Sequence, residues 1–134
     1  MEPNILILKK WKNNKDLQKK LNNQLKLDNE FGWKYPKKIK ENQRLIFLLD
    51  NRNILSILHI TLKKNELEFS FSYTPINERR KGYNKKLRLF IINKFKKEGY
   101  NKYTSTPYKE ANSIPLLKSL GFKKEGNQYI NRCL

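Results

Sequence analysis

The segment 66–87 constrains the fold most, because it joins a strand, a basic turn and a helix without a linker. Residues 66–73 alternate strictly between polar and apolar side chains, a pattern typical of a strand with one buried face. Three consecutive basic residues then precede Gly82, and a helical pattern over 85–97 follows. A helix that starts directly after a strand directs its first N–H groups and the positive end of its dipole toward the turn. We therefore expect this turn to bind an anion.

The remaining periodicity predicts a mixed α/β sheet covered by helices. Strand-like segments at 44–49, 54–62 and 66–73 are separated by short polar turns, which predicts an antiparallel meander. A strand, a helix and a closing hairpin follow the central helix. No repeat or linker interrupts residues 1–134, which we interpret as one domain. The other expected elements are strands at 5–8, 102–106, 122–125 and 128–133, and helices at 16–27, 85–97 and 113–120.

The same patterns predict which side chains share a face. In the strand 54–62 one face is expected to carry Ile54, Leu58, Ile60 and Leu62, and the other Leu55 and Ile57. In the next strand one face is expected to carry Leu67, Phe69, Phe71 and Tyr73. The buried face of the central helix is expected to carry Leu87, Phe90, Ile91 and Phe95.

The chain is strongly basic, with 30 Lys and Arg against 12 Asp and Glu and a net charge of +18. One interpretation is a polyanionic partner, because neutralised phosphates release counterions. The other is codon bias, since Lys and Asn are abundant throughout. We favour codon bias because the lysines are scattered, so nucleic acid is a partner we consider but do not prefer. No apolar run approaches the ~20 residues of a membrane span.

The single cysteine and the single histidine do not point to a disulfide or to a metal site. Cys133 cannot form an intramolecular disulfide, which fits a reducing compartment. Together with the absence of a signal-peptide pattern, this predicts a cytoplasmic protein. We expect the protein to be a monomer or a homodimer. His59 has no Cys, His or acidic partner at ligand spacing. We expect His59 to pack or hydrogen-bond, and we expect no metal site.

The basic turn resembles the phosphate-binding motif of the GNAT N-acetyltransferase superfamily. That motif is Gln or Arg, two residues, Gly, one residue, and then Gly or Ala, and here it reads Arg79, Arg80, Lys81, Gly82, Tyr83, Asn84. Asn84 departs from the pattern at the last position. Because Asn tolerates positive φ better than most residues, we expect the turn to survive there.

A second resemblance lies downstream, at residues 111–122. This segment is similar to the cofactor-side helix of the same superfamily, and its Ser-Ile, Leu-Leu and Leu-Gly-Phe pieces resemble the branch that acetylates protein N-termini, including ribosomal ones. Glu110 occupies the place of a common Asn, for which Asn112 is a candidate substitute. Leu117 occupies the place of a Tyr that acts as an acid in many relatives. The two motifs together span residues 66–133.

The resemblance implies a cofactor geometry with acetyl-CoA as co-substrate. The strands 66–73 and 102–106 would splay apart, and pantetheine would thread the gap between them. Its amides would pair with backbone groups of Ser72, Tyr73 and Thr74, and the pyrophosphate would lie on the turn 79–84. A backbone N–H near Tyr73 would face the thioester oxygen and stabilise the charge that develops there.

Acetyl transfer to an amine requires a proton acceptor, since an alkylammonium has no lone pair with which to attack the thioester. The resemblance places Glu68 where some relatives, including histone acetyltransferases, carry a basic Glu. Glu66 is the fallback, one pleat away on the same face, and a solvent-facing role is the alternative for both. Tyr108 and Ser113 are candidate acids. A thiolate is a tolerable leaving group, so an acid is not required.

We therefore expect an N-acetyltransferase that transfers an acetyl group from acetyl-CoA to a primary amine. The amine belongs to a protein N-terminus, a lysine or a small molecule, and the positive charge slightly favours a protein N-terminus over polyamines. Two alternatives remain: a basic nucleic-acid-binding module, and a GNAT-fold CoA binder without catalysis.

Overall fold

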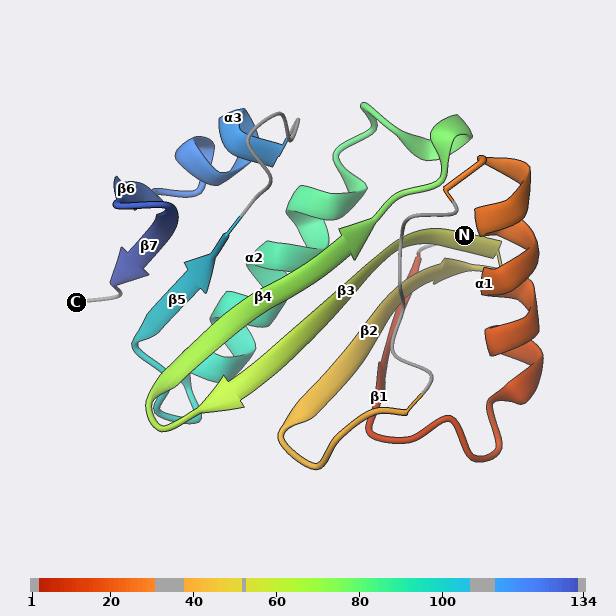
Figure 1. Ribbon diagram of the computed structural model, residues 1–134, viewed down its shortest axis with the longest axis horizontal. Coiled ribbons are helices and arrows are strands. Elements are labelled where there is room, and N and C mark those ends of the chain that lie inside the picture. The colour runs from red at the N-terminus through yellow and green to blue at the C-terminus, as the bar shows by residue number, and fades with distance from the viewer. Residues whose placement is uncertain (1–2, 31–37, 52, 107–112, 133–134) are drawn as a thin grey trace.

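The computed structural model describes residues 3–30, 38–51, 53–106 and 113–132, which form a seven-stranded sheet with helices on both faces (Figure 1). The strand order is β1-β2-β3-β4-β5-β7-β6, and every neighbouring pair is antiparallel except β4 and β5. The strands are β1 (Asn4–Leu8), β2 (Gln43–Asp50), β3 (Asn53–Lys63), β4 (Glu66–Tyr73), β5 (Lys102–Ser105), β6 (Lys123–Glu125) and β7 (Gln128–Arg132). The predicted mixed α/β sheet is confirmed.

The helices divide the core into two clusters, one on each face of the sheet. Helices α2 (Tyr83–Lys96) and α3 (Ser113–Ser119) pack in the cluster that contains Leu58 and Phe69. Helix α1 (Lys15–Leu27) packs in the other, around Phe47. No helix in the described ranges is long and apolar enough to cross a membrane.

Two irregularities in the strand register correct the predicted faces. Between β2 and β3 the pairing passes from Leu48–Ser56 to Leu49–Ile54, so Leu55 is an extra residue. Leu55 therefore packs on the α2 face with Leu58, while Ile54 joins Ile57 on the α1 face. The expected grouping of Ile54 with Leu58 is wrong, because a bulge reverses the alternation of a strand.

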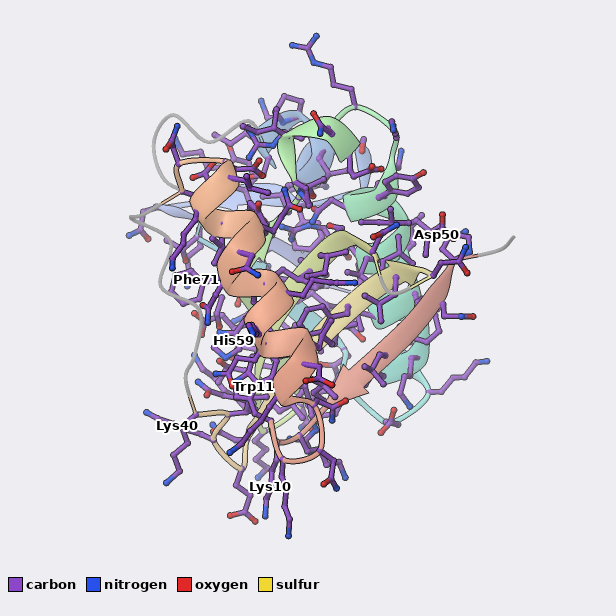
Figure 2. The ribbon with its side chains drawn as sticks, turned by 90° about the vertical axis from the view of Figure 1, so that its right-hand side faces the viewer. Lys10, Trp11, Lys40, Asp50, His59 and Phe71 are labelled. Atoms are coloured by element: carbon purple, nitrogen blue, oxygen red, sulfur yellow. The ribbon has the colours of Figure 1, made fainter. Side chains whose placement is uncertain are left out.

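A second bulge lies in β4 at Ser70, where the register passes from Phe69–Ile60 to Phe71–His59. Phe69 stays in the α2 cluster, but Phe71 and Tyr73 turn to the α1 face, so the predicted single face of β4 is also wrong. Figure 2 shows Phe71 and His59 on the α1 side of the sheet.

Helix α2 begins two residues earlier than predicted. Leu87, Ile91 and Phe95 are buried as expected, but Phe90 is 38% exposed. The expected burial of Phe90 is wrong, because the buried side of α2 extends from Leu87 toward Arg88 and Ile92 and not toward Phe90.

The parallel pair β4 and β5 forms a fork. Their ladder has four residue pairs and ends at Phe69 and Ser105, where β5 stops. Strand β4 continues for four more residues to Tyr73. The fork thus begins beside the bulge at Ser70 and opens toward the N-terminus of α2 (Figure 1).

Candidate functional site

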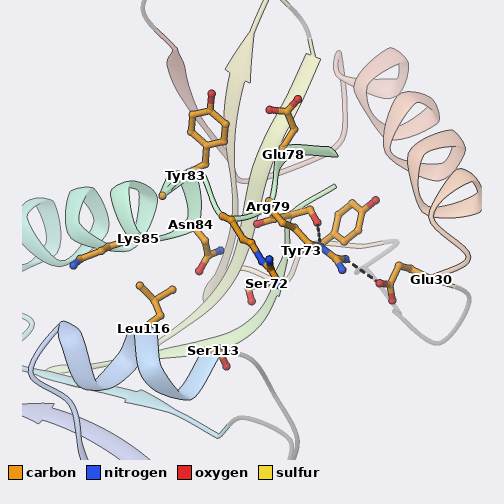
Figure 3. A pocket seen from close by; sticks show the side chains of 13 residues that line it. Glu30, Ser72, Tyr73, Glu78, Arg79, Tyr83, Asn84, Lys85, Ser113 and Leu116 are labelled. Carbon is orange, nitrogen blue, oxygen red and sulfur yellow. Dashed lines mark hydrogen bonds and ion pairs between the residues drawn. The ribbon is translucent and has the colours of Figure 1, made fainter. Parts of the chain in front are cut away.

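A cavity of about 820 Å³ lies at the open end of the fork (Figure 3). Its walls come from the end of β4, the turn that follows, the start of α2 and the start of α3. The predicted site residues on its walls are Ser72, Tyr73, Thr74, Arg79, Arg80, Gly82, Tyr83, Asn84 and Ser113. Four further residues border it that the sequence did not suggest, namely Glu30, Glu78, Lys85 and Leu116.

The turn before α2 takes its shape from two left-handed residues. Arg80 has φ 66° and Gly82, the N-cap of α2, has φ 80°. A Cβ at Gly82 would meet nothing within 4 Å, so the backbone angle and not space favours glycine there. The turn does not use the tolerance of Asn for positive φ at Asn84, because Asn84 is already in the first turn of α2, where φ is negative.

The basic side chains of the turn divide into two groups. Arg79 is engaged: its Nε donates to the Thr74 carbonyl at 2.8 Å and its Nη2 lies 3.0 Å from a Glu30 carboxylate oxygen. Lys81 pairs with Glu78 at 3.4 Å and borders a neighbouring cavity. Within the described ranges, Arg80 and Lys85 form no ion pair, which leaves their charge available at the cavity wall.

Asp28 anchors the end of β4 to α1. It accepts a short hydrogen bond from the Tyr73 hydroxyl and one of 3.0 Å from the Ile76 N–H. Burial raises the pKa of the Tyr73 hydroxyl, and the hydrogen bond and charge of Asp28 raise it further. Burial opposes ionisation of Asp28, but hydrogen bonds from Tyr73, Ile76 and Gln24 outweigh it and lower its pKa. Nothing in the sequence pointed to this contact between residues 45 apart.

The lowered pKa of Asp28 predicts an acid-sensitive contribution to stability. Ionised Asp28 stabilises the fold above its ordinary pKa of 3.8, and this contribution is lost as pH falls through the lowered value. We expect Asp28→Asn to reduce the urea midpoint near neutral pH and to flatten its decline between about pH 5 and pH 2. Glu41→Gln, at an exposed site, is the control and should keep the wild-type slope. Equal slopes for wild type and Asp28→Asn would contradict the assignment.

A polar network that the sequence did not reveal joins α2 to the strands. The Asn84 amide donates to Ser56 Oγ at 3.1 Å, and Ser56 Oγ lies 2.9 Å from Thr74 Oγ1. Arg88 Nε donates to Asn84 Oδ1 at 2.7 Å. Asn84 therefore connects the start of α2 to β3 and to the end of β4.

Glu68 lies beside the apex of the fork and does not line the cavity. Its neighbours Leu67 and Phe69 face α2, so its own side chain faces the α1 side. Glu68 pairs with Lys63 at 2.9 Å, and its side chain is 30% exposed. This hydrogen bond and charge raise the pKa of the Lys63 ammonium. Glu66 is the fallback base, and its Oε1 lies 3.9 Å from Lys102 Nζ.

The other predicted residues divide by location. Tyr108 and Asn112 lie outside the described residues, as does Cys133. Leu117 is buried in the α2 cluster. His59 is packed as expected, 4% exposed and stacked on Phe71 at 5.7 Å, and burial lowers its pKa. No cluster of His, Cys, Asp and Glu in the described part of the chain could hold a metal ion.

Comparison with known proteins identifies the fold. No family profile and no curated protein sequence matches the chain. Among solved structures, the ribosomal-protein-S18-alanine N-acetyltransferase from Escherichia coli superposes with a TM-score of 0.73 at 16% identity, covering 96% of this chain and 90% of that one. Tetrahymena GCN5 gives 0.71 at 16% identity, covering 100% and 97%.

A third similar structure was solved with a ligand. The PaiA N-acetyltransferase from Thermoplasma acidophilum, in complex with coenzyme A, gives a TM-score of 0.67 at 15% identity and covers 95% of this chain and 96% of that one. Likenesses at such identities establish the fold. The chain has the fold of the GNAT N-acetyltransferases.

Proposed function

We propose that this protein is an acetyl-CoA-dependent N-acetyltransferase. The observation that carries the proposal is the position of the cavity, which joins the N-terminus of α2, the basic turn and the open fork between β4 and β5 within a GNAT fold. A helix N-terminus with unpaired basic side chains favours a phosphorylated ligand. The coenzyme A complex of a structurally similar acetyltransferase agrees with this ligand class.

The residues on the cavity walls fit the two ends of such a co-substrate. The N–H groups of the first turn of α2, with Arg80 and Lys85, would hold the pyrophosphate. Backbone groups of Ser72, Tyr73 and Thr74 would pair with the pantetheine amides. Lys81 does not line this cavity and Asn112 lies outside the described residues. Both are proposed as cofactor-binding residues from the sequence motif alone.

When bound, acetyl-CoA supplies an acetyl group activated as a thioester. Glu68 would take the proton of the incoming amine, directly or through water, because it lies beside the fork apex. The amine nitrogen forms the C–N bond, the C–S bond breaks and its electron pair leaves with the CoA thiolate. The buried Leu117 cannot protonate that thiolate, so Ser113, on the cavity wall, and Tyr108 are the candidate acids.

The acceptor that we propose is a protein N-terminus, in the cytoplasm. The net charge of +18 disfavours free polyamines, and one of the similar structures is named a ribosomal-protein-S18-alanine N-acetyltransferase. Labelled acetyl-CoA offered with peptides of free N-terminus should label them. The same peptides with blocked N-termini and a free lysine should be labelled more slowly. CoA binding without transfer to any amine would favour the non-catalytic alternative.

A further inference from the structure

Phe71 presents an aromatic ring on the same face of β4 as the candidate base. The bulge at Ser70 turns Phe71 to the α1 face of the sheet (Figure 2), which Glu68 also faces. Phe71 is 37% exposed, and the side chain of Glu68 is 30% exposed. Both side chains can therefore be reached by a molecule that approaches the α1 face.

A shared neighbour shows that Glu68 and Phe71 lie close together. The Phe71 ring stacks on the His59 imidazole, with ring centroids 5.7 Å apart and ring planes 10° apart. Burial lowers the pKa of His59, and the charge of Glu68 opposes this shift. In the pairing of β3 with β4, Phe71 lies opposite His59 and Glu68 lies opposite Thr61. Two residues of a strand span roughly 6–7 Å, which is the separation expected between the backbone positions of Glu68 and Phe71.

The α1 face of β4 changes from charged to apolar between these two residues. Glu68 carries a carboxylate, and next on this face Ser70 Oγ lies 2.9 Å from Thr61 Oγ1. At the far end, the lowered pKa of His59 keeps the imidazole behind Phe71 uncharged at neutral pH. The Glu68 end therefore suits an amine, and the Phe71 end suits an apolar group.

Phe71 also lies beside the open part of the fork. The ladder between β4 and β5 ends at Phe69 and Ser105, and Phe71 belongs to the part of β4 that continues past it. Neither Phe71 nor Glu68 lines the cavity proposed for acetyl-CoA. An acceptor on the α1 face would thus approach the fork from the side opposite α2, without displacing the co-substrate.

We propose that Phe71 selects acceptors whose first residue has an apolar side chain, such as leucine or methionine, over polar side chains of the same size. The inference rests on the proposed function, because it takes the α-amine of the acceptor to approach Glu68 on the α1 face. The α-amine and the side chain of a residue are attached to the same carbon, so an amine at Glu68 brings that side chain within reach of Phe71. Their contact would remove apolar surface from water.

The test compares two peptides that differ only in their first residue, leucine or asparagine. The two side chains have nearly the same shape, and only leucine gains from contact with an apolar ring. We therefore expect kcat/KM of the wild-type protein to be ~10-fold higher for the leucine peptide, measured with labelled acetyl-CoA. Phe71→Ala should reduce this ratio to within about 2-fold of unity, because the ring surface is lost. Phe71→Leu keeps an apolar surface and should keep most of the ratio.

Phe90→Ala is the matched control. Phe90 is 38% exposed, close to the value for Phe71, but it lies on α2, at the other face of the sheet. Its replacement should leave the ratio of the two peptides unchanged. A loss of the ratio in Phe90→Ala as well would contradict a specific role of Phe71.

The outcomes separate this inference from the proposed function. Equal kcat/KM for the two peptides with the wild-type protein would overturn the role of Phe71 alone. An equal loss of rate for both peptides in Phe71→Ala, at an unchanged ratio, would show a structural role and would also overturn it. Binding of acetyl-CoA without transfer to any peptide would overturn the proposed acceptor and this inference together. The wild-type comparison needs no variant, so it decides the preference even if Phe71→Ala does not fold.

Discussion

Replacing Glu68 by Gln is expected to lower the turnover number by ~10²–10⁴, the usual contribution of a positioned general base. The amide keeps the shape and polarity of the side chain but cannot accept the proton of the amine. The apparent affinity for acetyl-CoA should hardly change, because Glu68 faces the α1 side of the sheet and does not line the cavity. Steady-state rates with a labelled acceptor, measured across pH, provide the test.

Glu66→Gln is the matched control for this prediction. Glu66 lies on the same face of β4, one pleat further from the fork, and also pairs with a lysine. Its replacement should leave the turnover number within a few-fold of wild type. An unaltered rate in Glu68→Gln would exclude Glu68 as the base, and a large loss in Glu66→Gln would transfer the role to Glu66. A loss of acetyl-CoA affinity in Glu68→Gln would mean that the pantetheine of acetyl-CoA reaches the α1 face of the sheet.

Replacing Gly82 by Val is expected to abolish stabilisation by CoA while the protein still folds. The N-cap of α2 has φ 80°, which a β-branched residue adopts only at a cost of roughly 1–3 kcal/mol. Space does not oppose the valine, so the turn relieves the strain by changing its backbone angles. The N–H groups at the start of α2 would then point away from a common centre. Melting temperatures with and without saturating CoA measure the effect.

Gly126→Val is the control, because it introduces the same kind of backbone strain outside the candidate site. Gly126 also has positive φ, 66°, and open space around a Cβ, but it lies in the β6–β7 hairpin away from the cavity. Both variants should lower the melting temperature of the free protein to a similar extent. Only Gly82→Val should lose the rise with CoA. A full CoA response in Gly82→Val would contradict the assignment of this turn to the phosphates.

The order of elements could be predicted because each depends on local periodicity, as in the alternation of β4 and the spacing of Leu87, Ile91 and Phe95. The bulges at Leu55 and Ser70 could not, since an extra residue is visible only in the pairing with a neighbouring strand. They decide which residues face α1. The stacking of Phe71 on His59 therefore could not be predicted from the alternation of β4 alone.

The candidate site also has features that the sequence predicted and features that it did not. The basic, glycine-containing turn was visible because its residues are consecutive, and it does border the cavity. Contacts between distant segments were not visible: Asp28 with Tyr73, and Ser56 with Asn84. Arg88 carried no signal in the sequence, because a lysine-rich helix offers many cations and only packing shows which one is buried.

Thermal melting with coenzyme A tests the central claim most directly. Free CoA at ~100-fold above its dissociation constant should stabilise the fold by ~2.7 kcal/mol. For a domain of this size that corresponds to a rise in melting temperature of roughly 10 °C. A short oligonucleotide should give no comparable rise. An unchanged melting temperature in millimolar CoA, or a rise with the oligonucleotide alone, would contradict a CoA-dependent acetyltransferase.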